Sequence, residues 1–143
     1  MTFNEAFIWE KLTEITKYQE ELKQHLKFSD QEILGDTGKM HIAERIFQLI
    51  VDLMLDINSH FIKELNLEIA DDFQGTFYIL GKHNVLDADF AQKVAPIVGI
   101  RNRIVHGYEK LDKERFVNEL RQNYRDFDRY IESVRNYLHA KTK

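Results

Sequence analysis

The chain has 143 residues and a formal net charge of −4, with 31% charged and 43% hydrophobic side chains. This size and composition favour one globular domain, residues 1–143, and argue against a disordered chain. The lack of cysteine excludes disulfides and thiolate metal sites and fits a cytoplasmic protein. We expect neither a signal peptide nor a membrane segment, because no apolar run approaches the ~20 residues that a membrane span needs.

The charge is unevenly distributed along the chain. Residues 93–115 carry six basic and three acidic side chains, a net charge of +3 within a chain whose total is −4. The overall acidity argues against a protein that coats nucleic acid with its whole surface, but a basic segment in an acidic body can concentrate an anion locally. On charge alone, a chance excess on a solvated helix is an equally good explanation.

Helical periodicity covers the N-terminal half of the chain. The spacing of its apolar residues predicts an amphipathic helix over residues 4–28. Ser29-Asp30 is suited to cap a short helix that ends near Gly35. A long helix is expected over residues 37–66. We predict that it is the central, most buried element, because more than half of its circumference is apolar: Ile42, Ala43, Ile46, Phe47, Leu49, Ile50, Leu53, Met54, Ile57, Phe61 and Leu65.

The C-terminal half is also helical, without the alternation of a strand. Asp71-Asp72 can cap a short helix that Gly81 would end, and Asp87 can cap the next helix. We expect that helix to continue past Pro96, which would bend it and either orient the segment that follows or make a harmless kink. Asp112 can cap the last helix, whose buried side would hold Phe116, Leu120, Phe127, Ile131, Val134 and Leu138. The predicted fold is all-α, an antiparallel helical bundle of four longer helices and one or two short ones.

One octapeptide combines a fixed positive charge, a group that titrates near neutral pH and a phenol: Arg101-Asn102-Arg103-Ile104-Val105-His106-Gly107-Tyr108. On an ideal helix, Tyr108 lies about 20° and His106 about 140° round from Arg101. Val94, Ile97, Ile104 and Val105 all lie within about 60° of the direction of Arg101. Arg101 is therefore expected to point into an apolar stripe, where a guanidinium is costly unless it is paired.

Two explanations of this arginine are open. Arg101 could pair inside the chain with Asp52 or Asp56, which interrupt the apolar central helix, and its role would then be structural. Alternatively, the stripe could face a second subunit, so that two copies of the octapeptide form one functional site.

The residues of the octapeptide suit the cleavage of an RNA phosphodiester. The 2′-hydroxyl of RNA supplies the nucleophile, so the protein has only to move protons and stabilise phosphoryl charge. His106 could act as general acid or base, and Arg101 could bind the phosphate. Asn102 and Arg103 could support phosphate binding, and Tyr108 could bind the phosphate or stack on a base. From spacing alone, a structural histidine is the commoner case. No histidine pair has metal-ligand spacing and no glycine-rich phosphate loop is present, so we expect no metal and no cofactor.

The octapeptide, with the lead-in Val98-Gly99-Ile100, resembles the signature of HepT-type toxins in the HEPN superfamily. The resemblance extends over most of the chain, although only this segment is specific. It implies a HEPN-like helical homodimer whose two motifs face each other across a cleft. It also implies a metal-independent endoribonuclease toxin of a toxin–antitoxin pair, with Arg101 and His106 as catalytic residues and Asn102 as the polar residue after the arginine.

The resemblance further implies a partner, a minimal nucleotidyltransferase antitoxin of the MntA type. Such antitoxins transfer AMP to the motif tyrosine, which here is Tyr108, and the resulting O-AMP-tyrosine would block the RNA site. The alternative function is a non-catalytic helical dimer that binds a nucleotidyltransferase or a nucleotide.

Overall fold

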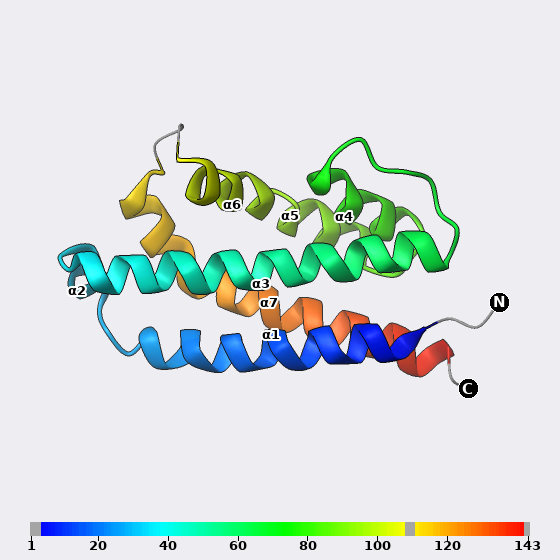
Figure 1. Ribbon diagram of the computed structural model, residues 1–143, viewed down its shortest axis with the longest axis horizontal. Helices are drawn as coiled ribbons and strands as arrows, with labels where there is room; N and C mark the ends of the chain where they lie inside the picture. The colour runs from blue at the N-terminus through cyan, green and yellow to red at the C-terminus, as the bar shows by residue number, and fades with distance from the viewer. Residues whose placement is uncertain (1–3, 108–110, 142–143) are drawn as a thin grey trace.

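The computed structural model describes residues 4–107 and 111–141 and is helical, without strands in those ranges. Its helices are α1 (Glu5–His25), α2 (Asp30–Leu34), α3 (Thr37–Glu64), α4 (Phe73–Lys82), α5 (Ala88–Val94), α6 (Ile97–His106) and α7 (Lys113–Lys141). Helix α3 crosses the middle of the molecule, with α1 antiparallel beside it and α4, α5 and α6 following one another along its other side (Figure 1). The predicted all-α bundle is confirmed. No helix in these ranges has the length and apolar content needed to cross a membrane.

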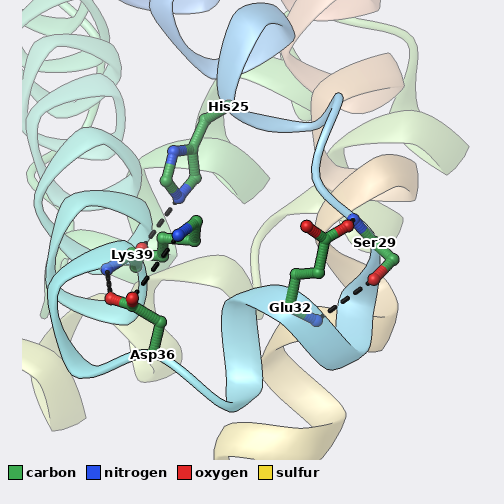
Figure 2. Close-up of polar contacts among 5 residues, drawn as sticks. All are labelled: His25, Ser29, Glu32, Asp36 and Lys39. Carbon is green, nitrogen blue, oxygen red and sulfur yellow. Dashed lines mark hydrogen bonds and ion pairs between the residues drawn. The ribbon is translucent and has the colours of Figure 1, made fainter.

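The helix caps predicted from the sequence are confirmed by hydrogen bonds, and Asp36 is a further cap that was not predicted. The Ser29 side chain accepts a hydrogen bond from Glu32 N, and the Glu32 carboxylate accepts one from Ser29 N (Figure 2). The backbone hydrogen bond from Ser29 lowers the pKa of Glu32 below its ordinary value. Helices α3, α4, α5 and α7 each begin at an aspartate whose carboxylate accepts a backbone N–H three residues later: Asp36, Asp72, Asp87 and Asp112.

A polar contact fixes the turn between α1 and α3. His25 is 7% exposed, and its Nε2 lies 2.7 Å from the carbonyl oxygen of Lys39 (Figure 2). Nε2 must therefore carry the proton that this carbonyl accepts. The ammonium of Lys39 in turn lies 3.4 Å from the cap carboxylate of Asp36. Together these contacts hold the start of α3 against the end of α1.

The expected helix through Pro96 is broken there, which corrects the prediction of four longer helices. Helix α5 ends at Val94 and α6 begins at Ile97, because proline has no N–H for the helical ladder and its ring crowds the preceding turn. Two backbone hydrogen bonds bridge the break, each between residues three positions apart: Val98 N donates to Ala95 O and Gly99 N donates to Pro96 O. Three helices are long, and the fourth place in the bundle is filled by α4, α5 and α6 in succession (Figure 1).

Gly81 does not end α4 as predicted. The helix continues to Lys82, and a Cβ built on Gly81 would lie 2.8 Å from the Cβ of Ala91 and 3.3 Å from the Cα of Ala88. Glycine at this position therefore allows α4 and α5 to approach closely. The sequence pattern suggested a helix stop because glycine serves both purposes.

The core surrounds α3, as predicted, but α3 is not buried on every apolar position. Phe47 is fully buried and packs edge-on against Phe116 at a centroid distance of 5.3 Å. Ile42, by contrast, is 50% exposed. The expectation that Ile42 is buried was wrong, because neighbouring helices cover only part of the apolar circumference of α3.

A buried polar network links α3 to α4 and α7. The Tyr130 hydroxyl is fully buried and donates to Asn58 Oδ1 at 2.6 Å, and Asn58 Nδ2 donates to Thr76 Oγ1 at 3.1 Å. Burial raises the pKa of Tyr130 well above its ordinary value. The network keeps buried polar groups satisfied and so fixes the relative placement of the three helices.

Candidate active site on α6

Helix α6 is anchored at its start and exposed at its end. Ile97 and Val98 are 4% and 3% exposed, whereas Val105 is 41% exposed and His106 is also exposed. The helix stops at Gly107, whose φ of +69° is the left-handed conformation that glycine adopts without strain. The polar residues of the octapeptide therefore lie on the last turns of a helix that a buried first turn holds in place.

Arg101 is paired inside the chain. Its Nε donates to Asp52 Oδ1 at 2.7 Å, and its Nη1 donates to Asn102 Oδ1 at 3.1 Å. The side chains of Arg101 and Asp52 are 19% and 34% exposed, so the ion pair is partly screened by solvent. Of the two predicted acidic partners, Asp52 is confirmed; Asp56 instead lies 3.7 Å from Lys11.

The pairing leaves binding capacity on the guanidinium. Arginine has five N–H donors in a planar fork, and one on Nε and one on Nη1 are engaged. Within residues 4–107 and 111–141, Nη2 has no acceptor. Asp52 thus fixes the direction of Arg101 through Nε and leaves an edge of the fork available to an anion.

The apolar stripe around Arg101 changes character along α6. Val94 and Ile97 before the arginine are buried, Ile104 after it is half-buried, and Val105 is 41% exposed. Arg101 therefore lies at the boundary between core and surface. This position explains how a charged side chain can occupy the apolar stripe without being buried away from solvent.

The structure brings Arg101 and Asn102 together but does not turn His106 toward Arg101. Five residues of helix separate them, which is about 140° of rotation. Arg101 faces α3, whereas Arg103 and His106 are exposed. The prediction that falls on Tyr108 lies outside the described residues. No three His, Asp or Glu side chains gather closely enough to hold a metal ion in the described part of the chain.

An exposed, partly apolar stripe of α3 continues the surface beside Arg101. Ile42, Arg45, Leu49 and Asp52 repeat at three- and four-residue steps and so lie on one face. Ile42 is 50% exposed, Arg45 is exposed and Leu49 is half-buried. Together with Val105, they form what we call the α3–α6 face, which contains the Arg101–Asp52 pair.

Sequence reasoning missed a second polar group, on α7. Asn123 and Asp126 are each 6% exposed and lie among the apolar positions of that helix. Asn123 lies three residues after Leu120, and Asp126 lies three residues after Asn123 and directly before Phe127, so both fall on the buried side. This interruption of an apolar repeat is the signal that could have revealed them. They line a cavity between α6 and α7.

Comparison with known proteins decides the family. The family model described as "Ribonuclease HepT-like" matches residues 15–134. The chain belongs to this family. The resemblance seen in the octapeptide is thereby confirmed, and it extends through the helical body as predicted.

Relatives of this HepT-like chain include two named nucleases. The tRNA nuclease HepT of Aphanizomenon flos-aquae is 30% identical over 128 residues, which are 90% of this chain and 87% of that protein. The mRNA nuclease HepT of Shewanella oneidensis is 24% identical over 88 residues, or 62% of this chain and 66% of that protein. The two names specify different RNAs.

The HepT-like fold is also seen in a solved toxin–antitoxin complex. The tri-AMPylated HEPN toxin of Shewanella oneidensis, in complex with an MNT antitoxin, superimposes with a TM-score of 0.84. The match covers 91% of this chain and 97% of that chain at 21% sequence identity. At this identity the similarity establishes the HEPN fold.

Proposed function

We propose that this HepT-like protein is a metal-independent endoribonuclease toxin that acts as a homodimer and is silenced by a nucleotidyltransferase antitoxin. The observation that carries the proposal is the orientation of the Arg101 guanidinium. Asp52 binds its Nε at the boundary between core and surface, and another edge of the guanidinium remains available to an anion. His106 is exposed on the same helix, less than two turns later. The nuclease names of two relatives support the same chemistry.

The proposed reaction uses the nucleophile that RNA itself supplies. The 2′-oxygen attacks the adjacent phosphorus as His106 accepts the 2′-hydroxyl proton, and the bond to the 5′-oxygen breaks as that oxygen receives a proton. The products are a 2′,3′-cyclic phosphate and a 5′-hydroxyl, so no water or metal is consumed. Arg101 stabilises the charge on the non-bridging oxygens, with Asn102 and Arg103 as supporting contacts.

A two-fold dimer would supply what one chain lacks. The reaction needs one group to take a proton and one to give it, and each chain has a single histidine in the motif. The α3–α6 face has exposed Ile42 and Val105 beside the Arg101–Asp52 pair. Packing two such faces together would cover these apolar side chains and bring two copies of His106 toward one cleft.

The proposed antitoxin mechanism acts through Tyr108. This residue follows His106 by two positions, directly after the glycine that ends α6. Transfer of AMP to its hydroxyl would add a negative phosphate that competes with RNA for Arg101. A structural relative is a tri-AMPylated toxin bound to an MNT antitoxin, which supports this form of silencing.

The decisive experiment is cleavage of total cellular RNA in EDTA by the unmodified protein. Intact-mass measurement first identifies which protein fractions carry added AMP, and only an unmodified fraction is assayed. We expect His106→Ala and Arg101→Ala each to lower the rate by about a hundredfold or more. His139→Ala, at the other end of the molecule near the end of α7, is the matched control and should retain the wild-type rate.

Two results would contradict the proposal. One is a folded, unmodified wild type that cleaves no RNA, which would favour the non-catalytic dimer that binds a nucleotidyltransferase or nucleotide. The other is cleavage by the wild type that is lost in EDTA and restored by added magnesium, which would show that a metal is required.

A further inference from the structure

A cavity of about 840 Å³ lies between α6 and α7, away from the Arg101–Asp52 pair. On an ideal helix, the cavity-lining residues Ile100 and Arg103 lie about 100° and 160° round from Arg101. The cavity and the Arg101–Asp52 pair are therefore on different sides of the same helix, and Arg103 is the residue of the octapeptide that reaches the cavity. The volume of the cavity falls within the ~300–1,000 Å³ range typical of small-molecule sites.

The inner wall of the cavity contains a buried amide without a partner. Asn123 is 6% exposed, and its Nδ2 has no hydrogen-bond acceptor in residues 4–107 or 111–141. Burying a donor without an acceptor destabilises the folded state, so an apolar residue here would favour folding. An acceptor on a ligand that enters the cavity would satisfy this donor.

Basic side chains lie at both ends of the cavity. At one end, the Lys93 ammonium of α5 lies 3.6 Å from the Asp126 carboxylate of α7. Asp126 is about one helical turn beyond Asn123. Arg103 and Arg115 line the other end, and both are exposed. An anionic group entering the cavity would therefore meet arginine at the end opposite to Lys93.

The acidic side chains of the cavity are already engaged. Asp126 accepts from Gln122 Nε2 at 3.1 Å as well as facing Lys93. Glu119 accepts from Arg115 Nε at 3.0 Å, which leaves the terminal nitrogens of that guanidinium without an acceptor in the described ranges. An amide donor inside the cavity and a guanidinium edge at its mouth therefore remain able to bind a ligand.

We propose that this cavity binds a nucleoside monophosphate, with the base accepting a hydrogen bond from Asn123 Nδ2 and the phosphate held by Arg115. Asparagine pairs well with the polar edge of a purine, and apolar side chains such as Ile97, Ile100 and Phe116 suit the flat faces of a base. Asn123 and Arg115 are eight residues apart on one helix, about 12 Å along its axis. The long side chain of Arg115 can extend toward Asn123, so the distance between its guanidinium and the Asn123 amide can match the length of a nucleotide.

The first test is a titration of unmodified protein with AMP, followed by NMR of the Asn123 side-chain amide and by calorimetry. The wild type should show a saturable shift of that amide. Asn123→Leu should weaken AMP binding about tenfold or more without lowering the unfolding temperature, because it removes an unsatisfied donor. Asn136→Leu makes the same change at an exposed position of α7 outside the cavity and should bind AMP like the wild type.

Two further variants separate the parts of the site. Asn123→Asp keeps the side-chain size and removes the Nδ2 donor, so it should also lose AMP binding if the leucine variant does not fold. Arg115→Gln should lose most of the preference for AMP over adenosine. A short oligoribonucleotide that displaces AMP at lower concentration would identify RNA as the source of the nucleotide, and a weaker competitor would favour the free nucleotide.

Binding of AMP to this cavity is measured without cleavage, so the result does not depend on ribonuclease activity. His106→Ala should bind AMP as the wild type does even though it is expected to be inactive. The proposed site is wrong if the Asn123 amide shows no saturable shift with AMP in the millimolar range. It is equally wrong if Asn123→Leu and Asn123→Asp bind AMP with wild-type affinity.

Discussion

At the scale of single residues, Arg101 shows how a charge placed in an apolar pattern is accommodated. Of the two open explanations, internal pairing is confirmed, because Arg101 Nε lies 2.7 Å from Asp52 Oδ1. The stripe is buried before the arginine and exposed after it, which allows the guanidinium to keep solvent contact. The sequence predicted Asp52 and Asp56 equally, since both interrupt α3, and only the side on which α6 packs distinguishes them.

Asp52→Asn tests whether this ion pair orients Arg101. We expect the free energy of unfolding to fall by only about 1 kcal/mol, because both side chains keep some solvent exposure. RNA cleavage should fall roughly tenfold or more, because a mispositioned guanidinium stabilises the transition state less well. Urea unfolding and the initial rate of cleavage measure the two effects.

Asp56→Asn is the matched control for this prediction. Asp56 lies one turn further along α3, is 54% exposed and pairs with Lys11 at 3.7 Å. Its substitution should change the free energy of unfolding by less than about 0.5 kcal/mol and leave cleavage intact. Equal cleavage by the two variants would show that Asp52 has no orienting role.

At the scale of helices, two helical glycines have opposite tertiary surroundings. Both Gly81 and Gly99 are inside helices. A Cβ on Gly81 would approach Ala91 Cβ to 2.8 Å, whereas a Cβ on Gly99 would meet nothing within 4 Å. Helix propensity alone favours alanine at both positions, so packing decides the difference.

Gly81→Ala should therefore lower the free energy of unfolding by about 1–3 kcal/mol, because α4 and α5 must separate. Gly99→Ala should raise it by about 0.5–1 kcal/mol, because alanine loses less backbone entropy in a helix. Thermal or urea unfolding of the two variants beside the wild type measures both changes. A stabilised Gly81→Ala variant would refute the close approach of α4 and α5.

The connection between α3 and α4 is held by an acid-sensitive contact. Glu68 accepts a hydrogen bond from Lys82 Nζ at 2.8 Å and also pairs with His83. The hydrogen bond from Lys82, followed by that from His83, lowers the pKa of Glu68 from 4.5 to about 2. Because the folded pKa is depressed, this contact is fully present above about pH 4.5 and is lost as the pH falls through about 2.

An NMR titration of the Glu68 side-chain carbonyl carbon checks this pH dependence. The wild type should titrate with a midpoint near 2, and Lys82→Ala should move the midpoint upward toward 4.5. Glu68→Gln should remove the acid-induced change in amide exchange of the α3–α4 connection. A wild-type midpoint near 4.5 would mean that the contact is not populated in solution.

At the scale of the whole molecule, the exposed apolar side chains bear on assembly. Ile42 and Val105 are 50% and 41% exposed and lie on the α3–α6 face, which the proposed dimer would cover. Ile69 is 92% exposed but belongs to the connection between α3 and α4, toward the other end of α3 (Figure 1). The same substitution at the two positions therefore distinguishes a specific interface from general surface hydrophobicity.

Ile42→Glu should convert a dimer into a monomer and abolish cleavage, because two buried carboxylates would face each other near the two-fold axis. Ile69→Glu should leave both the mass in solution and the cleavage rate unchanged. Light scattering after size-exclusion chromatography and the RNA assay measure these outcomes. An active monomer carrying Ile42→Glu would exclude a dimeric active site on this face.

Periodicity, caps and the octapeptide were enough to predict the helical class, most helix starts and the HepT-like family. These features are local, since a capping carboxylate needs only the backbone three residues ahead, as at Asp72 and Asp87. The tertiary structure decided what depends on neighbours distant in sequence. It selected Asp52 over Asp56, made Gly81 a contact point and exposed Ile42. It also placed Asn123 in the wall of a cavity that α6 lines, because only packing determines which side of one helix faces which neighbouring helix.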